Sequence, residues 1–126
     1  MNWNAIAAIL LALAVAFGAF GAHALRARLD AYSMGLWEKA VFYHFVHALG
    51  MLMVSILPRT QTFPVSAAVN VCWFLLTGVL VFSGSLYLLA VTGVRTLGMI
   101  TPVGGLAFIA GWLLLAWYFI AQRQTL

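Results

Sequence analysis

Long apolar stretches separated by short polar segments dominate the chain. A membrane-spanning helix needs about 20 predominantly apolar residues to cross a hydrocarbon core of about 30 Å, and four stretches reach that length. The pattern therefore predicts an all-α integral membrane protein, a four-helix up-down bundle with short connections between antiparallel neighbours. The predicted helices cover residues 4–22, 36–57, 66–90 and 102–121 of a single transmembrane domain, residues 1–126.

Prolines and charged residues mark the ends of these helices. Pro58 follows the second helix, and no charged residue lies between Arg59 and Arg95. Thr101 and Pro102 suit the cap and the first position of the fourth helix. The first stretch ends in a small-x-small sequence like that of a signal-peptide cleavage site, but no Lys or Arg precedes it. We therefore expect a retained helix there.

The composition indicates that lipid surrounds most of the molecule. Hydrophobic residues make up 66% of the chain and charged residues only 6%, whereas a soluble domain carries roughly 25% charged residues. One cysteine and two acidic residues exclude an internal disulfide, multi-cysteine clusters and a two-metal carboxylate centre. Six scattered basic residues do not form a nucleic-acid-binding face. We predict no enzyme activity, no catalytic residue, no metal, no cofactor and no nucleic-acid partner.

Basic residues are unevenly divided between the two predicted sides of the membrane. The first and third loops share one side and hold Arg26, Arg28, Lys39 and Arg95, whereas Arg59 and Arg123 lie on the other. Cytoplasmic loops are enriched in Lys and Arg, so we expect the first and third loops in the cytoplasm and both termini outside. Aromatic residues, Trp37 among them, are predicted to lie at the two membrane interfaces.

Small residues at helical spacing predict the faces on which the helices pack. Helices in lipid associate through close backbone approach, which small side chains permit. The predicted packing residues are Ala14, Gly18, Ala22, Gly78, Gly104, Gly105, Ala107 and Gly111. The alternative interpretation is a pore or groove lined by exposed glycine backbone.

Three histidines and a tyrosine are the candidate ligand-binding residues. Ionisable groups inside a bilayer are energetically unfavourable and commonly functional. Tyr43, His44 and His47 share one side of the second helix, with His47 about 15 Å below its start near Trp37. His23 ends the first helix on the same side of the membrane, so we expect all four side chains to face the bundle interior.

Three interpretations of this cluster are open. The first is a hydrogen-bonded core that ties helices together. The second is a ligand-binding or proton-relay site, because imidazole titrates near neutral pH. The third is a haem site, which requires nitrogens on opposite faces of the haem and therefore His23 opposite His44 or His47.

The two acidic residues are predicted to lie near the lipid headgroups. We expect Asp30 to begin a short interfacial segment and Glu38 to lie at the N-terminal end of the second helix, where a carboxylate suits the helix dipole. Arg95 lies on the same side and is expected to pair with Glu38 or Asp30. Anchoring is the favoured role of these charges.

Four motifs together resemble a known family: GAFGAH at residues 18–23, YH at 43–44 with HAL at 47–49, FSGSLY at 82–87 and ITPVGG at 100–105. In this order they are similar to the YgdD/YwdK-type family of small four-helix bacterial inner-membrane proteins, over about residues 5–121. The resemblance implies a multi-pass protein of the inner membrane. It implies no established activity, substrate or catalytic residue.

The favoured function is therefore a non-enzymatic component of the cell inner (plasma) membrane that binds lipid or another membrane protein, with self-association as a further expectation. The alternative is a small transporter of a neutral or weakly charged solute. Small multidrug exporters have a similar size and helix number, which is an analogy of fold only. The second alternative is a histidine-ligated haem or redox protein.

Overall fold

Helices account for most of the chain in the computed structural model, which describes residues 1–122. In chain order the elements are α1 (Trp3–Phe20), η1 (Gly21–Leu25), α2 (Ala31–Ile56), η2 (Leu57–Thr60), α3 (Val65–Gly78), η3 (Val79–Ser83), α4 (Gly84–Thr92), η4 (Arg95–Met99) and α5 (Thr101–Gln122). They join into four spans long and apolar enough to cross a membrane. The predicted all-α fold, with four helices long and apolar enough to span a membrane, is confirmed for residues 1–122.

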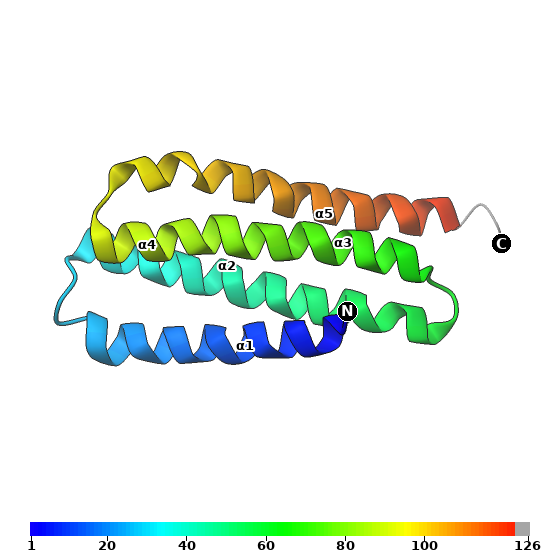
Figure 1. The fold of residues 1–126 in the computed structure, drawn as a ribbon, viewed down its shortest axis with the longest axis horizontal. Coiled ribbons are helices and arrows are strands. Elements are labelled where there is room, and N and C mark those ends of the chain that lie inside the picture. Colours follow the sequence, from blue (N-terminus) through cyan, green and yellow to red (C-terminus); the bar gives the residue numbers. More distant parts are fainter. Residues whose placement is uncertain (123–126) are drawn as a thin grey trace.

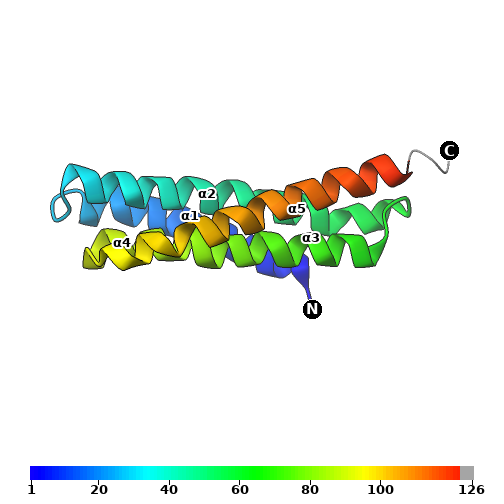
Figure 2. The ribbon, with the colours of Figure 1, turned by 90° about the horizontal axis from the view of Figure 1, so that it is seen from above.

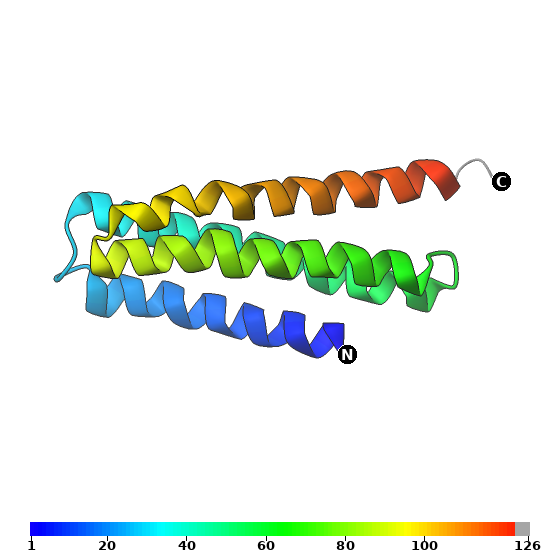
Figure 3. The same cartoon turned by 45° about the horizontal axis from the view of Figure 1, so that its top comes forward.

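The four spans run up and down, with α2 and the third span (α3–η3–α4) in the middle and α1 and α5 on opposite flanks (Figure 1 and Figure 3). Seen from above, α5 crosses the bundle obliquely (Figure 2). The α1–α2 and α4–α5 connections share one end, and the α2–α3 connection lies at the other (Figure 1). This arrangement puts Arg26, Arg28 and Arg95 at one end. Arg123, part of the predicted charge count, lies outside the described residues, and the orientation in the membrane stays a prediction.

The centre of the bundle is an apolar core, and its outer helices expose apolar surface. The largest fully buried side chains include Met51, Val54, Val71, Cys72 and Leu75, all on α2 and α3. In contrast, α1 and α5 expose large side chains such as Ile9, Leu113 and Ile120. Large exposed apolar surfaces mark contact with a membrane or a partner, which agrees with helices that face lipid.

The second span begins at Ala31 instead of near Leu36, because Asp30 caps it. The Asp30 carboxylate accepts a hydrogen bond of 2.7 Å from the backbone N–H of Ser33, one of the donors that a first helical turn leaves free. This hydrogen bond lowers the pKa of the exposed Asp30 carboxyl below its ordinary value. Its contribution to stability is therefore present above the ordinary pKa and lost as the pH falls through the lowered one. The interfacial segment expected here is the first turn of α2.

Thr101 is the first residue of α5, not the N-cap expected from the sequence. A 3₁₀ turn, η4, precedes it, so the helical span begins before Pro102. The Thr101 hydroxyl lies 2.6 Å from the hydroxyl of Ser85 on α4. It therefore links two neighbouring spans instead of capping one.

Within residues 1–122, two π-helical turns interrupt the regular helices. In η1 the backbone N–H of Arg26 donates to the carbonyl of Gly21 at 3.1 Å, and in η3 the N–H of Gly84 donates to the carbonyl of Val79. Both hydrogen bonds reach five residues back, so each turn holds more residues than an α-helical turn. Each π turn therefore takes up about one extra residue.

One predicted packing residue, Ala22, does not lie on the packed face of the first span. Ala14 is buried and Gly18 half-buried, but Ala22, the next residue of the predicted stripe, is exposed. Gly21 takes the inward position in its place, seven residues after Ala14. Its backbone N–H still donates to the carbonyl of Phe17, so the helix is regular up to Gly21, and a Cβ at Gly21 would lie 2.6 Å from Cδ1 of Trp37. The small-residue stripe thus ends one residue earlier than its spacing indicates.

The predicted packing glycines of the third and fourth spans lie at close helix contacts. A Cβ at Gly104 would lie 2.7 Å from Cα of Phe82, so backbone meets backbone there. A Cβ at Gly78 would overlap the ring of Phe108, and one at Gly111 would lie 3.1 Å from the nearest α3 side-chain atoms. Of the other two predicted packing residues, Gly105 and Ala107 are half-buried.

Candidate functional site

The structure buries two of the four candidate side chains. His44 and His47 are 3% and 6% exposed, whereas Tyr43 is 36% exposed at the edge of the bundle. His23 lies in η1, where Gly21 and Leu25 take the inward positions, and it is exposed. The expectation of an inward orientation is therefore right for His44 and His47 and wrong for His23. Tyr43, which is 36% exposed, faces the interior only in part.

His44 connects three spans. Its Nδ1 lies 3.0 Å from the hydroxyl oxygen of Tyr87 on α4. Its Nε2 is buried and has no hydrogen-bond partner within residues 1–122, and its ring lies edge-on to that of Phe17 on α1, with centroids 6.2 Å apart. We assign the Tyr87 hydroxyl as the donor to Nδ1, which places the ring proton on Nε2.

His47 connects α2 to α5. Its Nδ1–H donates to the backbone carbonyl of Tyr43, one turn earlier, at 2.7 Å. Its ring stacks on Phe108 of α5, with ring centroids 3.5 Å apart and planes 14° from parallel. These contacts fit the interpretation of a hydrogen-bonded, packed core. Ligand binding by this cluster stays a prediction.

The haem alternative required His23 to face one of the buried histidines across a cavity. His23 is exposed on the outside of η1, whereas His44 and His47 are enclosed between helices. Within the described part of the chain, no group of three or more His, Cys, Asp or Glu side chains is placed to hold a metal ion. The arrangement therefore does not supply the opposed pair of nitrogens that this alternative needs.

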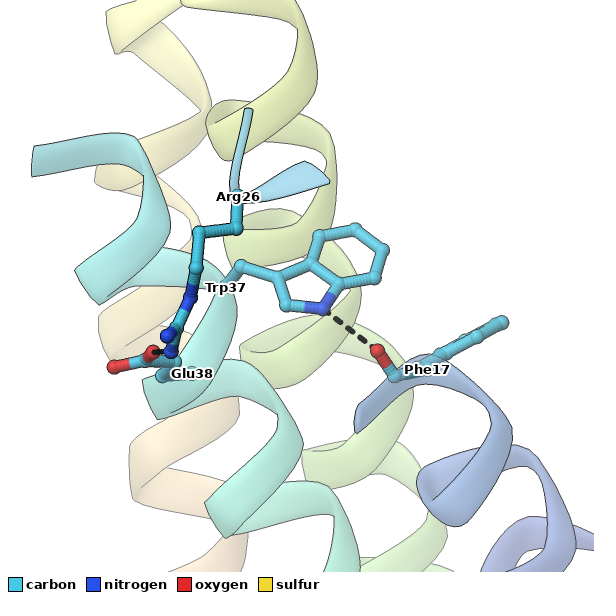
Figure 4. A network of polar contacts seen from close by, with 4 residues as sticks. All are labelled: Phe17, Arg26, Trp37 and Glu38. Atoms are coloured by element: carbon cyan, nitrogen blue, oxygen red, sulfur yellow. Dashed lines mark hydrogen bonds and ion pairs between the residues drawn. The ribbon is translucent and has the colours of Figure 1, made fainter. Parts of the chain in front are cut away.

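Trp37 forms a polar contact that the sequence did not reveal. It was expected among interfacial aromatics, but it is buried between α1 and α2. Its indole N–H donates to the backbone carbonyl of Phe17 at 2.9 Å (Figure 4), and its ring lies 4.6 Å from that of Tyr87. The small residues around Gly21 were the available signal, since only a glycine there leaves space for the indole.

A groove of about 330 Å³ lies beside Trp37. The small residues Gly18, Gly21 and Ala22 form its wall on the first span, and apolar α2 residues including Phe45 form the other wall. Arg26 and Glu38 supply the charged part of the lining. Gly18 and Ala22 of the small-residue stripe therefore also border a groove. A groove lined by exposed glycine backbone stays an alternative prediction.

An ion pair joins the two charged residues of this groove. Arg26 Nη2 lies 4.0 Å from Glu38 Oε1, and the two side chains are 72% and 63% exposed (Figure 4). We expected Arg95 to pair with Glu38 or Asp30. Glu38 instead pairs with Arg26, and Asp30 caps α2. A pair this exposed contributes at most about 1 kcal/mol, so either partner can exchange it for another charge.

A second groove, of about 340 Å³, lies between α2 and α5. It is bordered by Gly50, against which the ring of Trp112 packs, and by apolar residues such as Met53 and Phe119. Thr60 is the polar side chain of its lining. Unlike the groove beside Trp37, it carries no charged residue in its lining.

Comparison with known proteins gives a family without an assigned activity. A family model described as "Protein of unknown function (DUF423)" matches residues 17–105. A UPF0382 membrane protein of Staphylococcus haemolyticus is 47% identical over 110 residues, 87% of this chain and 88% of the relative. YwdK, a UPF0382 membrane protein of Bacillus subtilis, is 40% identical over 110 residues, 87% of this chain and 89% of the relative. The resemblance to YwdK-type proteins is confirmed. No solved structure matches the chain.

Proposed function

The chain belongs to the DUF423 family of proteins of unknown function, and on this premise we propose that it is a non-enzymatic multi-pass protein of the cell inner membrane that binds phospholipid in the groove between α1 and α2. The relatives are named membrane proteins, and the four apolar spans agree with that setting. The inner membrane, the binding activity and the absence of catalysis are parts of the proposal.

The shape of the groove is the observation that carries the proposal. From Met34 to Phe45 the α2 wall covers eleven helical steps, about 16 Å. Glu38 lies about one turn from the Met34 end, beside Arg26, and apolar side chains follow it to Phe45. A phospholipid has the same order of chemistry, a charged headgroup followed by an acyl chain. The α1–η1 wall is formed by glycine and alanine, which leaves room for such a chain.

The placement of the polar groups supports binding over catalysis. His44 and His47 are held by a tyrosine hydroxyl and a backbone carbonyl. The two carboxylates of the chain, Asp30 and Glu38, are exposed and lie elsewhere, at the N-terminal end of α2. General acid–base catalysis needs such groups together, within hydrogen-bond reach of one substrate.

Filling the groove tests the proposal. Replacing Ala22 with leucine is expected to reduce the phospholipid retained by the purified protein several-fold, because the larger side chain occupies the space of an acyl chain. Ala22 is exposed, so the folded state should accommodate the change. The measurement is native mass spectrometry after extraction from membranes.

The matched control is Ala16→Leu, on an exposed position of α1 outside the groove lining. This variant is expected to retain as much lipid as the unmodified protein. Equal retention by both variants and the unmodified protein would contradict lipid binding in this groove.

A second candidate function, transport of a neutral or weakly charged solute, is supported by one observation. Nε2 of His44 is buried and has no hydrogen-bond partner within residues 1–122, and such an atom is a place where a polar solute can bind. Saturable solute flux into liposomes that disappears in a His44→Leu or Tyr43→Phe variant would support transport. Retained lipid without flux supports the first candidate. Self-association and a protein partner stay predictions.

The expected orientation makes a separate prediction. A reporter that is active only in the cytoplasm is expected to give no signal when it is fused to the C-terminus, because the end of the bundle with more basic residues should face the cytoplasm. Lysines added next to Arg59, at the other end, are expected to weaken or reverse this preference. An active C-terminal reporter in the unmodified protein would contradict the orientation and leave the four spans unaffected.

A further inference from the structure

We propose that Arg26 and Glu38 together bind the headgroup of a zwitterionic, amine-bearing phospholipid, with the Arg26 guanidinium on the phosphate and the Glu38 carboxylate on the primary ammonium. This inference rests on the proposed function, since it assigns the headgroup of the lipid whose acyl chain occupies the groove. The chemical class is a phosphoethanolamine lipid.

The distance and exposure of Arg26 and Glu38 show that their ion pair is easily replaced. The two opposite charges lie 4.0 Å apart at the limit of an ion pair, and both side chains are more than half exposed. Their mutual attraction is therefore weak and screened by solvent. A ligand with one negative and one positive group, a short distance apart, can replace the direct contact while both protein charges stay paired.

The chemistry of each side chain sets the direction of binding. A guanidinium presents several N–H donors in a plane and matches phosphate oxygens in a bidentate way. A carboxylate accepts hydrogen bonds and therefore suits a primary ammonium, which has three N–H donors. A quaternary ammonium has no N–H to donate, so a phosphocholine headgroup is a poorer match for Glu38.

Glu38 also disfavours a purely anionic headgroup. A phosphate bound at Arg26 lies close to the Glu38 carboxylate, and a lipid without a positive group leaves that carboxylate facing a like charge. Like charges at this distance oppose each other. In the groove lining, Arg26 thus attracts any phosphate and Glu38 selects for a headgroup with an amine.

The position of the pair connects it to the groove. Arg26 directly follows η1, whose Gly21 and Ala22 line the groove, and Glu38 follows Trp37, which closes the groove on the α2 side. A headgroup held by both charges is therefore continuous with an acyl chain between the two spans. The apolar groove between α2 and α5 has no comparable pair in its lining.

Native mass spectrometry with defined lipids tests the inference. The full-length protein in detergent is exposed to equal amounts of phosphatidylethanolamine, phosphatidylcholine and phosphatidylglycerol with identical acyl chains. We expect phosphatidylethanolamine to be retained about threefold more than either competitor, the change that one exposed ion pair provides. Equal retention of the three lipids overturns the headgroup assignment alone, whereas no retained lipid of any kind overturns the proposed function as well.

Three variants separate headgroup binding from a structural ion pair. Glu38→Gln is expected to remove the preference for phosphatidylethanolamine over phosphatidylglycerol, and Arg26→Gln to reduce the retention of all three lipids. The double exchange Arg26→Glu with Glu38→Arg keeps an ion pair but places a carboxylate at the phosphate position, so the preference should be lost.

The matched control is Arg95→Gln, which removes the same charge. Arg95 begins η4, in the connection that shares its end of the bundle with the α1–α2 connection (Figure 1), and it lies outside the groove lining. It is expected to leave both the preference and the total retention unchanged. An unchanged preference in Glu38→Gln or in the double exchange overturns the proposal, as does an equal loss of retention in Arg26→Gln and Arg95→Gln.

Discussion

Replacing Gly104 with alanine is expected to lower the free energy of unfolding by about 3 kcal/mol, the upper end of the range for an overpacked core. A Cβ at Gly104 would meet the backbone N and Cα of Phe82 in η3. Backbone atoms cannot rotate away as a side chain can, so α5 and the third span must separate. The same replacement at Gly105 is expected to leave stability unchanged or raise it by up to about 1 kcal/mol, because alanine favours helix over glycine.

The two neighbouring glycines form a matched pair for this measurement. A Cβ at Gly105 would lie 3.6 Å from the ring of Phe82, an ordinary contact. Cys72 is the one cysteine of the chain and is fully buried, so a thiol-reactive fluorescent dye reports unfolding of either variant in detergent. Equal stability of the two variants would falsify the close backbone contact between α5 and η3.

Replacing Trp37 with alanine is expected to have an effect of similar size, about 3 kcal/mol. The change leaves a cavity between α1 and α2, removes the ring contacts with Phe17 and Tyr87, and removes the hydrogen bond to the Phe17 carbonyl. Trp37→Phe keeps an aromatic ring and loses the indole N–H, so its expected loss is about 1 kcal/mol. The Cys72 thiol again reports unfolding.

The difference between the two Trp37 variants separates packing from hydrogen bonding. If the indole mainly fills space, the phenylalanine variant should approach the stability of the unmodified protein. An alanine variant as stable as the unmodified protein would contradict the buried position of Trp37. Because Trp37 also closes the groove, the alanine variant should in addition show altered lipid retention.

The parts of the fold that depend on apolar length and regular spacing were predictable from the sequence. The four spans follow from runs of apolar residues. The inward orientation of His44 and His47 follows from their position within α2, where the helix is regular. Gly104 and Gly111 were identified for the same reason, because α5 is continuous around them.

The errors concern the helix face on which a residue lies and the partner that a polar side chain contacts. The buried face of the first span follows Ala7, Ala14 and Gly21, seven residues apart. Ala22 and His23 lie off that face, although the four-residue spacing of small residues favoured Ala22. The hydrogen bond of Trp37 was not predicted because its acceptor, the Phe17 carbonyl, is a backbone atom 20 residues away. The partner of Glu38 depended on which of several basic residues at one end of the bundle came nearest, and sequence spacing does not determine this.

The π turn η3, which lies inside the third span between α3 and α4, also amounts to a single-residue insertion that the helix absorbs without changing the alignment of its two flanks. Removing one residue within η3 would restore a plain α-helix and leave the flanking contacts in phase. A deletion elsewhere in a span would rotate everything beyond it by about 100° and move the lipid-facing residues into the core. A change in the length of the third span is therefore best accommodated at η3.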